Sequence, residues 1–586
     1  MGSQVQAPVV LEPAAYRFGD FRLKSDGTLL CREATLEIPA EELALLRALL
    51  ARQGEVVSAG ELSRAVSGES RPSRQRLTAC LASLRKILQS GVRIESVSRR
   101  GYRIQAVSEP EEDPSPHSLT RLAILPFSTG YDVPEFLGKT VAEQTMEQLR
   151  NARPAIVSVA ARDSVNTLAR RGLRPVEIGK LLRADRLLTG QVLATPGRYR
   201  LRAEIIRVAD GVPLWVEDLM MGREHVADLA AELAHRVTSR LGGSISIQAE
   251  AAPTVRIETT KAQREASHLY LRAHHEWPSL ERYRMQDAMA RLLRAVELDA
   301  SLTPARVDLA QLTILQCIHG YLSPRIAAAT VRRAAEGIPE LNQQAERLLP
   351  ALGWIEFHYD RDARSALRLM AYTEGLPYDP SNVRAHAWFL SSRHRFGEAV
   401  ELLSASIQSD PYSPWLQAAR AWLLHLAGER DASVAQIEKA IDLASDYDNT
   451  LFFGAMILGY NRETARALEV AETLANRSSH YDLATSAHAY ALACAGRKDE
   501  SHSLLERLQW LSRERFVLNT LNAATHVVLG ENDAAIEELR NANETRCPWF
   551  FQSLADPRLD PLKKLPEFAA LKSVWAAMEA EASHPA

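Results

Sequence analysis

The sequence predicts a multidomain protein of the α and α/β classes: a small mixed domain, then an α/β domain, then an all-α array. Two stretches read as linkers, one rich in proline, serine and acid at 107–121 and one opening with two glycines at 242–255. Between them, alternating and helical apolar patterns mix, whereas from about Lys261 the pattern is almost entirely helical. We therefore expect a linker at 108–120 and domains at 14–107, 121–241 and 256–586.

Composition narrows the class of protein without indicating a function. The 586 residues allow about three to four domains of ~150 residues each, and the net charge of -3 favours no particular partner. Five widely spaced cysteines without CxxC spacing predict neither a zinc site nor a disulfide framework. The most apolar run, 451–460, is half the ~20 residues of a membrane helix, and the N-terminus lacks a signal peptide. We expect a cytoplasmic protein.

The stretch "LTACLASLRKIL" predicts a helix with one apolar side, which begins near Pro72 and Ser73 and ends before Gly91. Its four leucines are spaced by four, three and four residues and therefore align along one side: Leu77, Leu81, Leu84 and Leu88. The opposite side carries small and polar residues: Gln75, Ala79, Ala82 and Lys86, with Thr78 and Arg85 beside them.

The following stretch, "VRIESVSRRGYRI", predicts a β-hairpin, because apolar residues alternate on either side of a turn near 99–101. Positive charge gathers over this helix and hairpin although the whole chain is slightly acidic. The basic residues are Arg71, Arg74, Arg76, Arg85, Lys86, Arg93, Arg99, Arg100 and Arg103, and Glu95 is the one acid among them. Such charges alone more often belong to a solvated basic face of a small domain. A helix followed by a basic hairpin makes a nucleic-acid-binding surface the favoured interpretation.

A helix with a small, polar outer side fits the major groove of DNA. Ala79 and Ala82 allow close approach and can meet thymine methyl groups, and Gln75 can pair with the edge of adenine. A basic hairpin beside the helix can contact the sugar-phosphate backbone or enter the minor groove. The candidate DNA contacts are Arg71, Arg74, Gln75, Arg76, Thr78, Ala79, Ala82, Arg85, Lys86, Arg93, Arg99, Arg100 and Arg103.

Residues 16–106 resemble the winged helix-turn-helix domain of OmpR/PhoB-type regulators. After short opening strands, "AEELALLRALLARQGEVVS" matches the first helix of that family and "AGELSRAV" the second. The stretch "LTACLASLRKIL" matches the recognition helix, and "IESVSRRGYRI" matches the wing signature. The resemblance implies a recognition helix in the major groove, and it makes the loop 67–72 a candidate contact for RNA polymerase.

The chain also departs from the pattern of these regulators. Thr78 and Cys80 stand near the family's Asp and His, so the target sequence cannot be carried over, and Arg99 replaces the first glycine of the wing. No counterpart of the phosphoacceptor aspartate is found, so we expect no two-component phosphorylation. The layout resembles the HilA-like branch of invasion-gene activators, which joins such a domain to a tetratricopeptide-type region and controls type III secretion genes. The lack of a membrane helix argues against the membrane-bound CadC/ToxR branch.

The middle region mixes helices and strands, which predicts an α/β domain. Strands are expected at 121–127, 155–160, 186–194, 198–208 and 213–221, and helices at 141–151 and about 224–241. The region resembles the TolB amino-terminal-like domain. "TPGRYR" lacks the glycines and lysine of a phosphate loop, so a structural or dimerising role is favoured over nucleotide binding.

The C-terminal half repeats with the tetratricopeptide period. Gly496 and Gly530 are 34 residues apart, and Gly428 precedes Gly496 by 68, which is twice 34. Stacked helix pairs of this kind form a concave face for a peptide, protein or signal. Six tryptophans of the region are expected in the core rather than in a ligand cage: Trp354, Trp388, Trp415, Trp422, Trp510 and Trp549. His274, His275, His386 and His394 lack metal-ligand spacing.

These patterns predict a DNA-binding transcriptional regulator, an activator by resemblance, located in the bacterial cytoplasm at the nucleoid. We expect promoter DNA as a partner, RNA polymerase as a candidate, a signal or partner protein on the helical array, self-association, and neither membrane nor cofactor. The alternative is a tetratricopeptide scaffold or chaperone-like adaptor with only non-specific nucleic-acid binding. An enzyme built on the α/β domain is least favoured, since no catalytic or metal-binding constellation is recognisable.

Overall fold

The computed structural model forms two compact units, Met1–Leu119 and Thr120–Ala586. The structure describes residues 15–18, 21–23, 28–31, 34–36, 38–50, 56–67, 74–88, 92–97, 101–105, 108–111, 120–151, 157–222, 226–241, 260–276, 282–336, 338, 345–372, 379–478 and 482–583. The expected linker at 242–255 lies outside these residues. No described helix is long and apolar enough to cross a membrane.

An antiparallel sheet in the first unit has the order β4-β3-β2-β1-β7. Its strands are β1 (Ala15–Phe18), β2 (Phe21–Leu23), β3 (Leu29–Cys31), β4 (Ala34–Leu36) and β7 (Ser108–Glu111). The sequence predicts a linker at 108–120. In the structure, the first four residues of that stretch form β7 and pair with β1. Pro110 lies in this edge strand, which is where a sheet tolerates proline.

Three helices and a hairpin complete the first unit: α1 (Ala40–Leu50), α2 (Ala59–Ser67), α3 (Arg74–Ile87), β5 (Arg93–Val97) and β6 (Gly101–Gln105). The local sequence begins α2 sharply. The Ser58 hydroxyl accepts from the Glu61 backbone N–H (3.3 Å), and the Glu61 carboxylate accepts from the Ser58 N–H (3.2 Å), which is a capping box. Leucines from all three helices meet in one core beneath the sheet residues Phe18 and Phe21.

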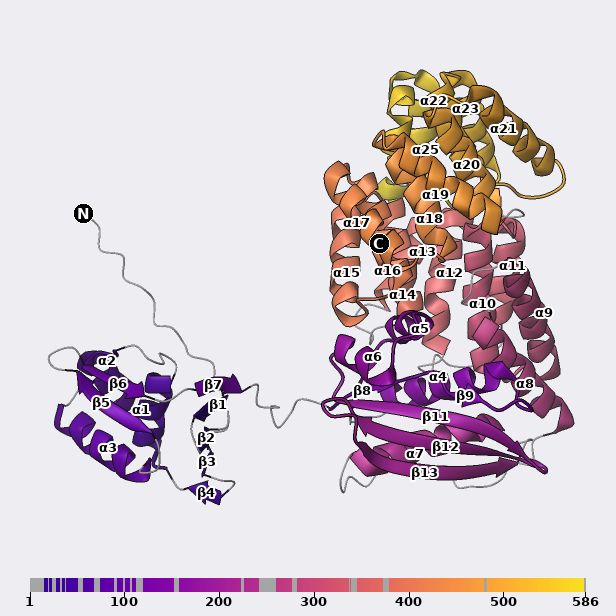
Figure 1. Cartoon of the computed structure of the whole chain (residues 1–586). Helices are drawn as coiled ribbons and strands as arrows, with labels where there is room; N and C mark the ends of the chain where they lie inside the picture. Colours follow the sequence, from indigo (N-terminus) through magenta and orange to yellow (C-terminus); the bar gives the residue numbers. More distant parts are fainter. Residues whose placement is uncertain are drawn as a thin grey trace, which may run out of the picture. The chain divides into compact units, whose positions relative to one another are not determined.

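The second unit opens with a mixed sheet of order β10-β8-β11-β12-β13 (Figure 1). Its strands are β8 (Thr120–Ile124), β9 (Ser128–Thr129), β10 (Val157–Val159), β11 (Arg186–Thr195), β12 (Arg198–Arg207) and β13 (Pro213–Gly222). Alternating residues of β8 face opposite sides: Leu122 and Ile124 pack under α4 (Glu135–Asn151) and α7 (Val226–Leu241). Ala123 faces α5 (Arg162–Arg170) and α6 (Pro175–Leu181).

The remaining chain stacks antiparallel helix pairs into an array. These helices are α8 (Lys261–Glu276), α9 (Arg282–Leu298), α10 (Thr303–Ile318), α11 (Pro324–Ala335), α12 (Leu349–Ile355), α13 (Ala363–Ala371), α14 (Pro380–Ser392), α15 (Phe396–Ser409), α16 (Pro414–Leu426), α17 (Arg430–Leu443), α18 (Asp448–Tyr460), α19 (Thr464–Arg477), α20 (Asp482–Cys494), α21 (Lys498–Ser512), α22 (Asn519–Leu529), α23 (Asn532–Glu544), α24 (Phe550–Ser553), the 3₁₀ helix η5 (Pro557–Lys564) and α25 (Pro566–Ser583).

The turns inside five successive pairs keep the 34-residue period. A residue with positive φ stands at each: His394 (58°), Gly428 (82°), Arg462 (68°), Gly496 (77°) and Gly530 (87°). The glycine spacing in the sequence therefore marked only three of the five turns. The other two hold a side chain in the left-handed region, which glycine adopts without steric cost.

Replacing Arg462 with glycine is expected to stabilise the array, because it removes a non-glycine residue from φ 68°. We expect a gain of about 0.5–1 kcal/mol in the free energy of unfolding, partly offset by the greater freedom of glycine in the unfolded chain. Thermal unfolding measured by circular dichroism tests this. The matched control, Gly428→Ala, makes the reverse change at the equivalent turn and should lower the melting temperature; a lower value for Arg462→Gly would contradict the argument.

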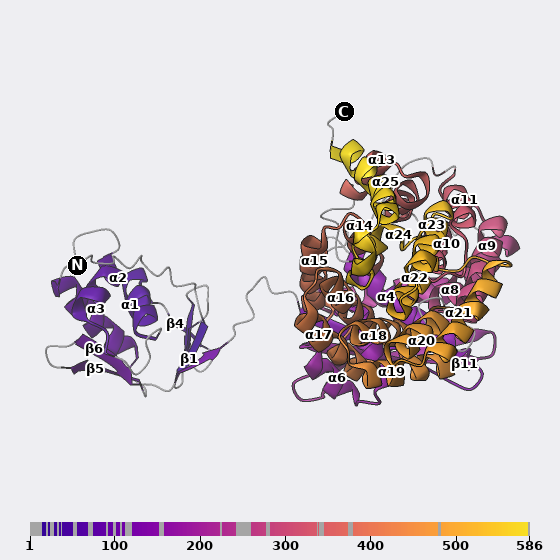
Figure 2. The same cartoon turned by 90° about the horizontal axis from the view of Figure 1, so that it is seen from above.

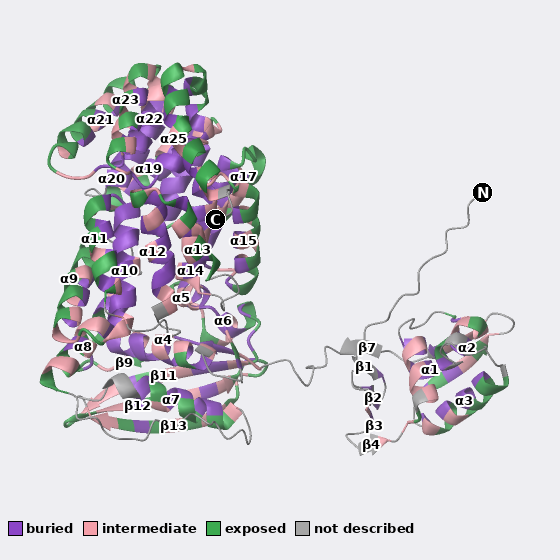
Figure 3. Cartoon of the chain, turned by 180° about the vertical axis from the view of Figure 1, so that it is seen from behind, coloured by how far each residue is buried: buried purple, intermediate pink, exposed green. Residues whose placement is uncertain are grey.

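The segment around α24 fills the inner side of the array (Figure 2). The Trp549 indole N–H donates to the Ile318 carbonyl (2.8 Å), and its ring packs edgewise on Trp388 (4.7 Å between centroids) and Trp422 (6.0 Å). Inner helices such as α10 and α20 are consequently buried nearly all round (Figure 3). At these helices, the face expected to receive a partner is covered by the chain's own residues.

Polar contacts join the helical array to the α/β region within the second unit. The Asp410 carboxylate accepts from the Ser164 backbone N–H (2.9 Å) and from its hydroxyl, and Arg347 pairs with Glu147 (2.9 Å). Because Asp410 closes α15 and Ser164 lies in the first turn of α5, these bonds join the end of one element to the start of another.

Candidate nucleic-acid interface

The recognition helix of the sequence prediction is α3, and the structure turns its leucines inward. Leu77, Leu81, Leu84 and Leu88 are at most 2% exposed. Gln75, Arg76, Thr78, Ala79, Ala82, Arg85 and Lys86 are exposed. Gln75, Thr78, Ala79 and Ala82 line a shallow, open hollow on this outer face. A polar face with small side chains is thus available to a ligand, which is the surface that insertion into a groove requires.

Cys80 and Glu41 anchor α3 to the first helix. The Cys80 thiol lies 3.4 Å from the Glu41 carboxylate, and Arg76 pairs with the same carboxylate at 3.4 Å. Burial, together with this acidic neighbour, raises the pKa of Cys80 to about 11, so the thiol stays protonated at neutral pH. Both members of the Arg76–Glu41 pair are about half exposed, so this ion pair is worth little and leaves Arg76 able to reorient.

The hairpin β5–β6 is held against α3 by Arg85. Its guanidinium donates from Nε (3.2 Å) and Nη2 (2.9 Å) to the backbone carbonyl of Ile94. Within the hairpin, Glu95 and Arg103 face each other in register and pair at 2.9 Å. Arg85 and Arg103 therefore have structural bonds that the sequence did not indicate, since these depend on how the helix and hairpin pack.

A close backbone approach fixes the turn end of the hairpin. Val57 and Tyr102 exchange two backbone hydrogen bonds of 2.9 Å, which add a third strand-like segment beside β6. Gly101 has φ 140°, and a Cβ there would lie 2.0 Å from the Val57 carbonyl oxygen. Glycine is required at this position.

The candidate DNA contacts thus fall into three groups. Gln75, Thr78, Ala79, Ala82 and Lys86 share the outer face of α3 with Arg76, and Arg93 is exposed at the start of β5. Arg85 is hydrogen-bonded to the Ile94 carbonyl, and Arg103 is paired with Glu95. Arg71, Arg99 and Arg100 lie outside the described residues, and for Arg74 the structure describes only its place in α3.

In the described part of the chain, no group of three His, Cys, Asp or Glu side chains could hold a metal ion. His274, one of the histidines weighed from the sequence, bonds instead to the buried Asp308 carboxylate (2.5 Å).

Comparison with known proteins agrees with this geometry. Residues 33–104 match the family described as "Transcriptional regulatory protein, C terminal". The chain is 24% identical over 573 residues to the transcriptional regulator HilA of Salmonella typhimurium, covering 95% of this chain and 99% of that protein, and equally to HilA of Salmonella typhi.

Among solved structures, the APC/C hetero-tetramer Cut9–Hcn1 is similar at 15% identity, with a TM-score of 0.38 over 61% of this chain and 66% of that chain. The fold itself combines an N-terminal helix-turn-helix domain with small sheets, a mixed sheet and a C-terminal array of helix pairs. The chain is therefore a DNA-binding transcriptional regulator with an OmpR/PhoB-type winged helix-turn-helix domain at residues 33–104.

Proposed function

We propose that this regulator reads promoter DNA with the outer face of α3 in the major groove, while the hairpin β5–β6 lies on the backbone or in the adjacent minor groove. The observation that carries the proposal is the division of α3 into a buried leucine side and an exposed side of small and polar residues. Gln75 reads a base edge, Ala79 and Ala82 permit close approach, and Lys86 and Arg93 neutralise phosphates.

The similarity to HilA over nearly the whole chain supports finer proposals. We propose that the protein activates transcription at the bacterial nucleoid, with virulence or type III secretion genes among its targets, and contacts RNA polymerase through the loop 67–72. The α/β region has no catalytic role in this proposal. Together with the helical array it receives a signal or partner and supports self-association, in which case paired half-sites are expected in the DNA.

Two substitutions separate reading of bases from attraction to phosphates. Gln75→Ala is expected to change the preferred base at one position, with about 1–3 kcal/mol less discrimination, because it removes a base contact. Lys86→Ala is expected to weaken binding to every sequence alike. It should also reduce the slope of log affinity against log salt concentration by about one. Selection of bound DNA from a random pool by the full chain, followed by fluorescence anisotropy at two salt concentrations, measures both effects.

Lys180→Ala is the matched control, since Lys180 is an exposed lysine on α6, away from the winged-helix domain in the sequence. It should leave affinity and preference unchanged. Equal losses on all sequences for Gln75→Ala and Lys86→Ala would show that α3 does not read bases. If the full chain selected no sequence at all, the adaptor with only non-specific nucleic-acid binding would be the better description.

A further inference from the structure

Arg76 lies in the first turn of α3, between the outer face of the helix and its buried side. It follows Gln75, which lines the outer hollow, and precedes Leu77, which is 2% exposed. Its own side chain is 58% exposed. An arginine at the start of a recognition helix can turn toward a phosphate, which every sequence offers, or toward a base edge, which only some sequences offer. Whatever fixes the direction of Arg76 therefore decides whether it contributes to specificity.

The Glu41 carboxylate, from the first turn of α1, holds one side of the Arg76 guanidinium. Its Oε1 lies 3.4 Å from Arg76 Nη2, and its Oε2 accepts from the Cys80 thiol at 3.4 Å. Arg76 and Cys80 are four residues apart, so one edge of α3 holds both oxygens of this carboxylate. Burial raises the pKa of the Cys80 thiol to about 11, so the thiol remains a donor at neutral pH. Cys80 thus keeps Glu41 in place without competing with it for Arg76.

The Arg76–Glu41 pair is weak in water and gains strength under a bound duplex. Both side chains are about half exposed, so the pair contributes little to the stability of the free domain. A duplex that covers α3 excludes water from the pair, and the attraction between the two charges grows as the effective dielectric constant falls. With its Nη2 side on Glu41, the planar guanidinium can present its other side to N7 and O6 of guanine. A guanidinium held in this way loses less rotamer freedom on binding than a mobile one.

We propose that Glu41 is a positioning residue that directs Arg76 to a guanine in the major groove rather than to a phosphate. This inference rests on the proposed function, in which α3 lies in that groove. Without Glu41, Arg76 would be a mobile cation that meets phosphates on any sequence. With Glu41, its guanidinium is oriented before the duplex arrives, and the contact is made only where a guanine stands opposite it. Glu41 therefore raises the ratio of the affinity for a site with that guanine to the affinity for a site without it.

Comparison of Glu41→Ala with Glu42→Ala tests the proposal in the full chain. Both changes remove one carboxylate from the first turn of α1, so they alter the net charge and the helix terminus alike. Selection from a random pool by the wild type and by Arg76→Ala identifies the G·C pair that depends on Arg76, and a second probe carries A·T at that position. Fluorescence anisotropy then gives the ratio of the two affinities. We expect a ratio of about tenfold or more for the wild type and for Glu42→Ala. For Glu41→Ala we expect a ratio about three- to tenfold smaller, without a loss of affinity for the A·T probe.

Two further variants separate positioning from a general loss of structure. Glu41→Gln keeps the shape of the side chain without its charge, and its ratio should lie between those of the wild type and Glu41→Ala. In the Arg76→Ala background, Glu41→Ala should change the ratio no further, because it acts through Arg76. Equal ratios for Glu41→Ala and Glu42→Ala, a further loss in the Arg76→Ala background, or an unchanged selection by Arg76→Ala would each overturn the proposal while DNA reading by α3 stood. If the wild-type chain selected no sequence, the proposed function would itself fail, and the role of Glu41 with it.

Discussion

Replacing Asp556 with alanine is expected to lower the free energy of unfolding of the 120–586 unit by about 3–5 kcal/mol, because it leaves a buried charge without its partner. Asp556 and Arg558 are 3% and 5% exposed and pair at 2.7 Å. The Arg558 guanidinium also lies 5.1 Å from the centre of both the Trp422 and the Tyr490 ring. Without the carboxylate, the positive charge would remain enclosed by these rings.

The protonation of Asp556 follows from the same contacts. Burial alone raises the pKa of its carboxyl, but Arg558 and the hydrogen bond from His425 outweigh burial and hold the pKa below its usual value. A carboxyl with a lowered pKa in the folded state stabilises the fold above its unfolded pKa. That contribution is lost as the pH falls toward the pKa of the folded state. The free energy of unfolding of Asp556→Ala should therefore decrease less than that of the wild type as the pH is lowered.

Urea unfolding followed by tryptophan fluorescence measures the change. Asp560→Ala is the matched control. Asp560 lies in η5, the helix that Asp556 caps, and it pairs with Lys563 at 2.6 Å, but both side chains are about half exposed. This control should cost about 0.5 kcal/mol or less. The double change Asp556→Leu with Arg558→Met should recover part of the loss, because no charge then stays buried. Similar losses for Asp556→Ala and Asp560→Ala would refute the argument.

The outer face of α3 could be predicted from the sequence because it depends on one helix alone. The leucine spacing determines which side turns inward, and the structure buries Leu77, Leu81 and Leu84 accordingly. The bonds of Arg85 could not be predicted, because they depend on the distance between α3 and β5. A count of basic residues therefore overstates the charge available to DNA: the helix and hairpin use some of it for their own packing.

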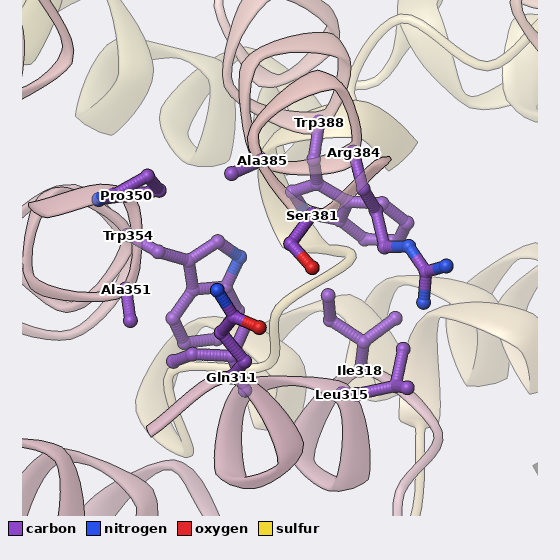
Figure 4. A pocket seen from close by; sticks show the side chains of 11 residues that line it. Gln311, Leu315, Ile318, Pro350, Ala351, Trp354, Ser381, Arg384, Ala385 and Trp388 are labelled. Carbon is purple, nitrogen blue, oxygen red and sulfur yellow. The ribbon is translucent and has the colours of Figure 1, made fainter. Parts of the chain in front are cut away.

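The helical array shows the same limit. The glycine period identified the repeat, but His394 and Arg462 adopt the turn conformation without the residue that signals it. Trp354 and Trp388 lie inside the array, as expected of core tryptophans, but the same expectation is wrong for Trp510, which is 55% exposed on α21. The indole N–H groups of Trp354 and Trp388, which have no hydrogen-bond partner among the described residues, become apparent only when three helices from separate repeats are brought together (Figure 4). Nor did any local pattern show that the segment around Trp549 covers the inner side, since its contacts reach residues 231 positions away in the chain.

Replacing Gly101 with alanine is expected to weaken binding to all DNA sequences at least tenfold and to destabilise the first unit by about 2–4 kcal/mol. An alanine Cβ would lie 2.0 Å from the Val57 carbonyl oxygen, and φ 140° is disfavoured for any side chain. The backbone must therefore move, and the two hydrogen bonds between Val57 and Tyr102 are lost. Fluorescence anisotropy with selected DNA measures the affinity, and hydrogen exchange at the Val57 and Tyr102 amides measures the local opening.

Gly60→Ala is the control for an added methyl group in the same domain. No atom lies within 4 Å of a Cβ at Gly60, and alanine suits helix α2 better than glycine by about 0.5–1 kcal/mol, so affinity should be unchanged and stability slightly higher. If Gly101→Ala bound DNA as tightly as the wild type, the hairpin would have no part in the interface. If it altered the preferred sequence in the manner of Gln75→Ala, the hairpin would read bases; a uniform loss shows that it positions α3 and grips the backbone.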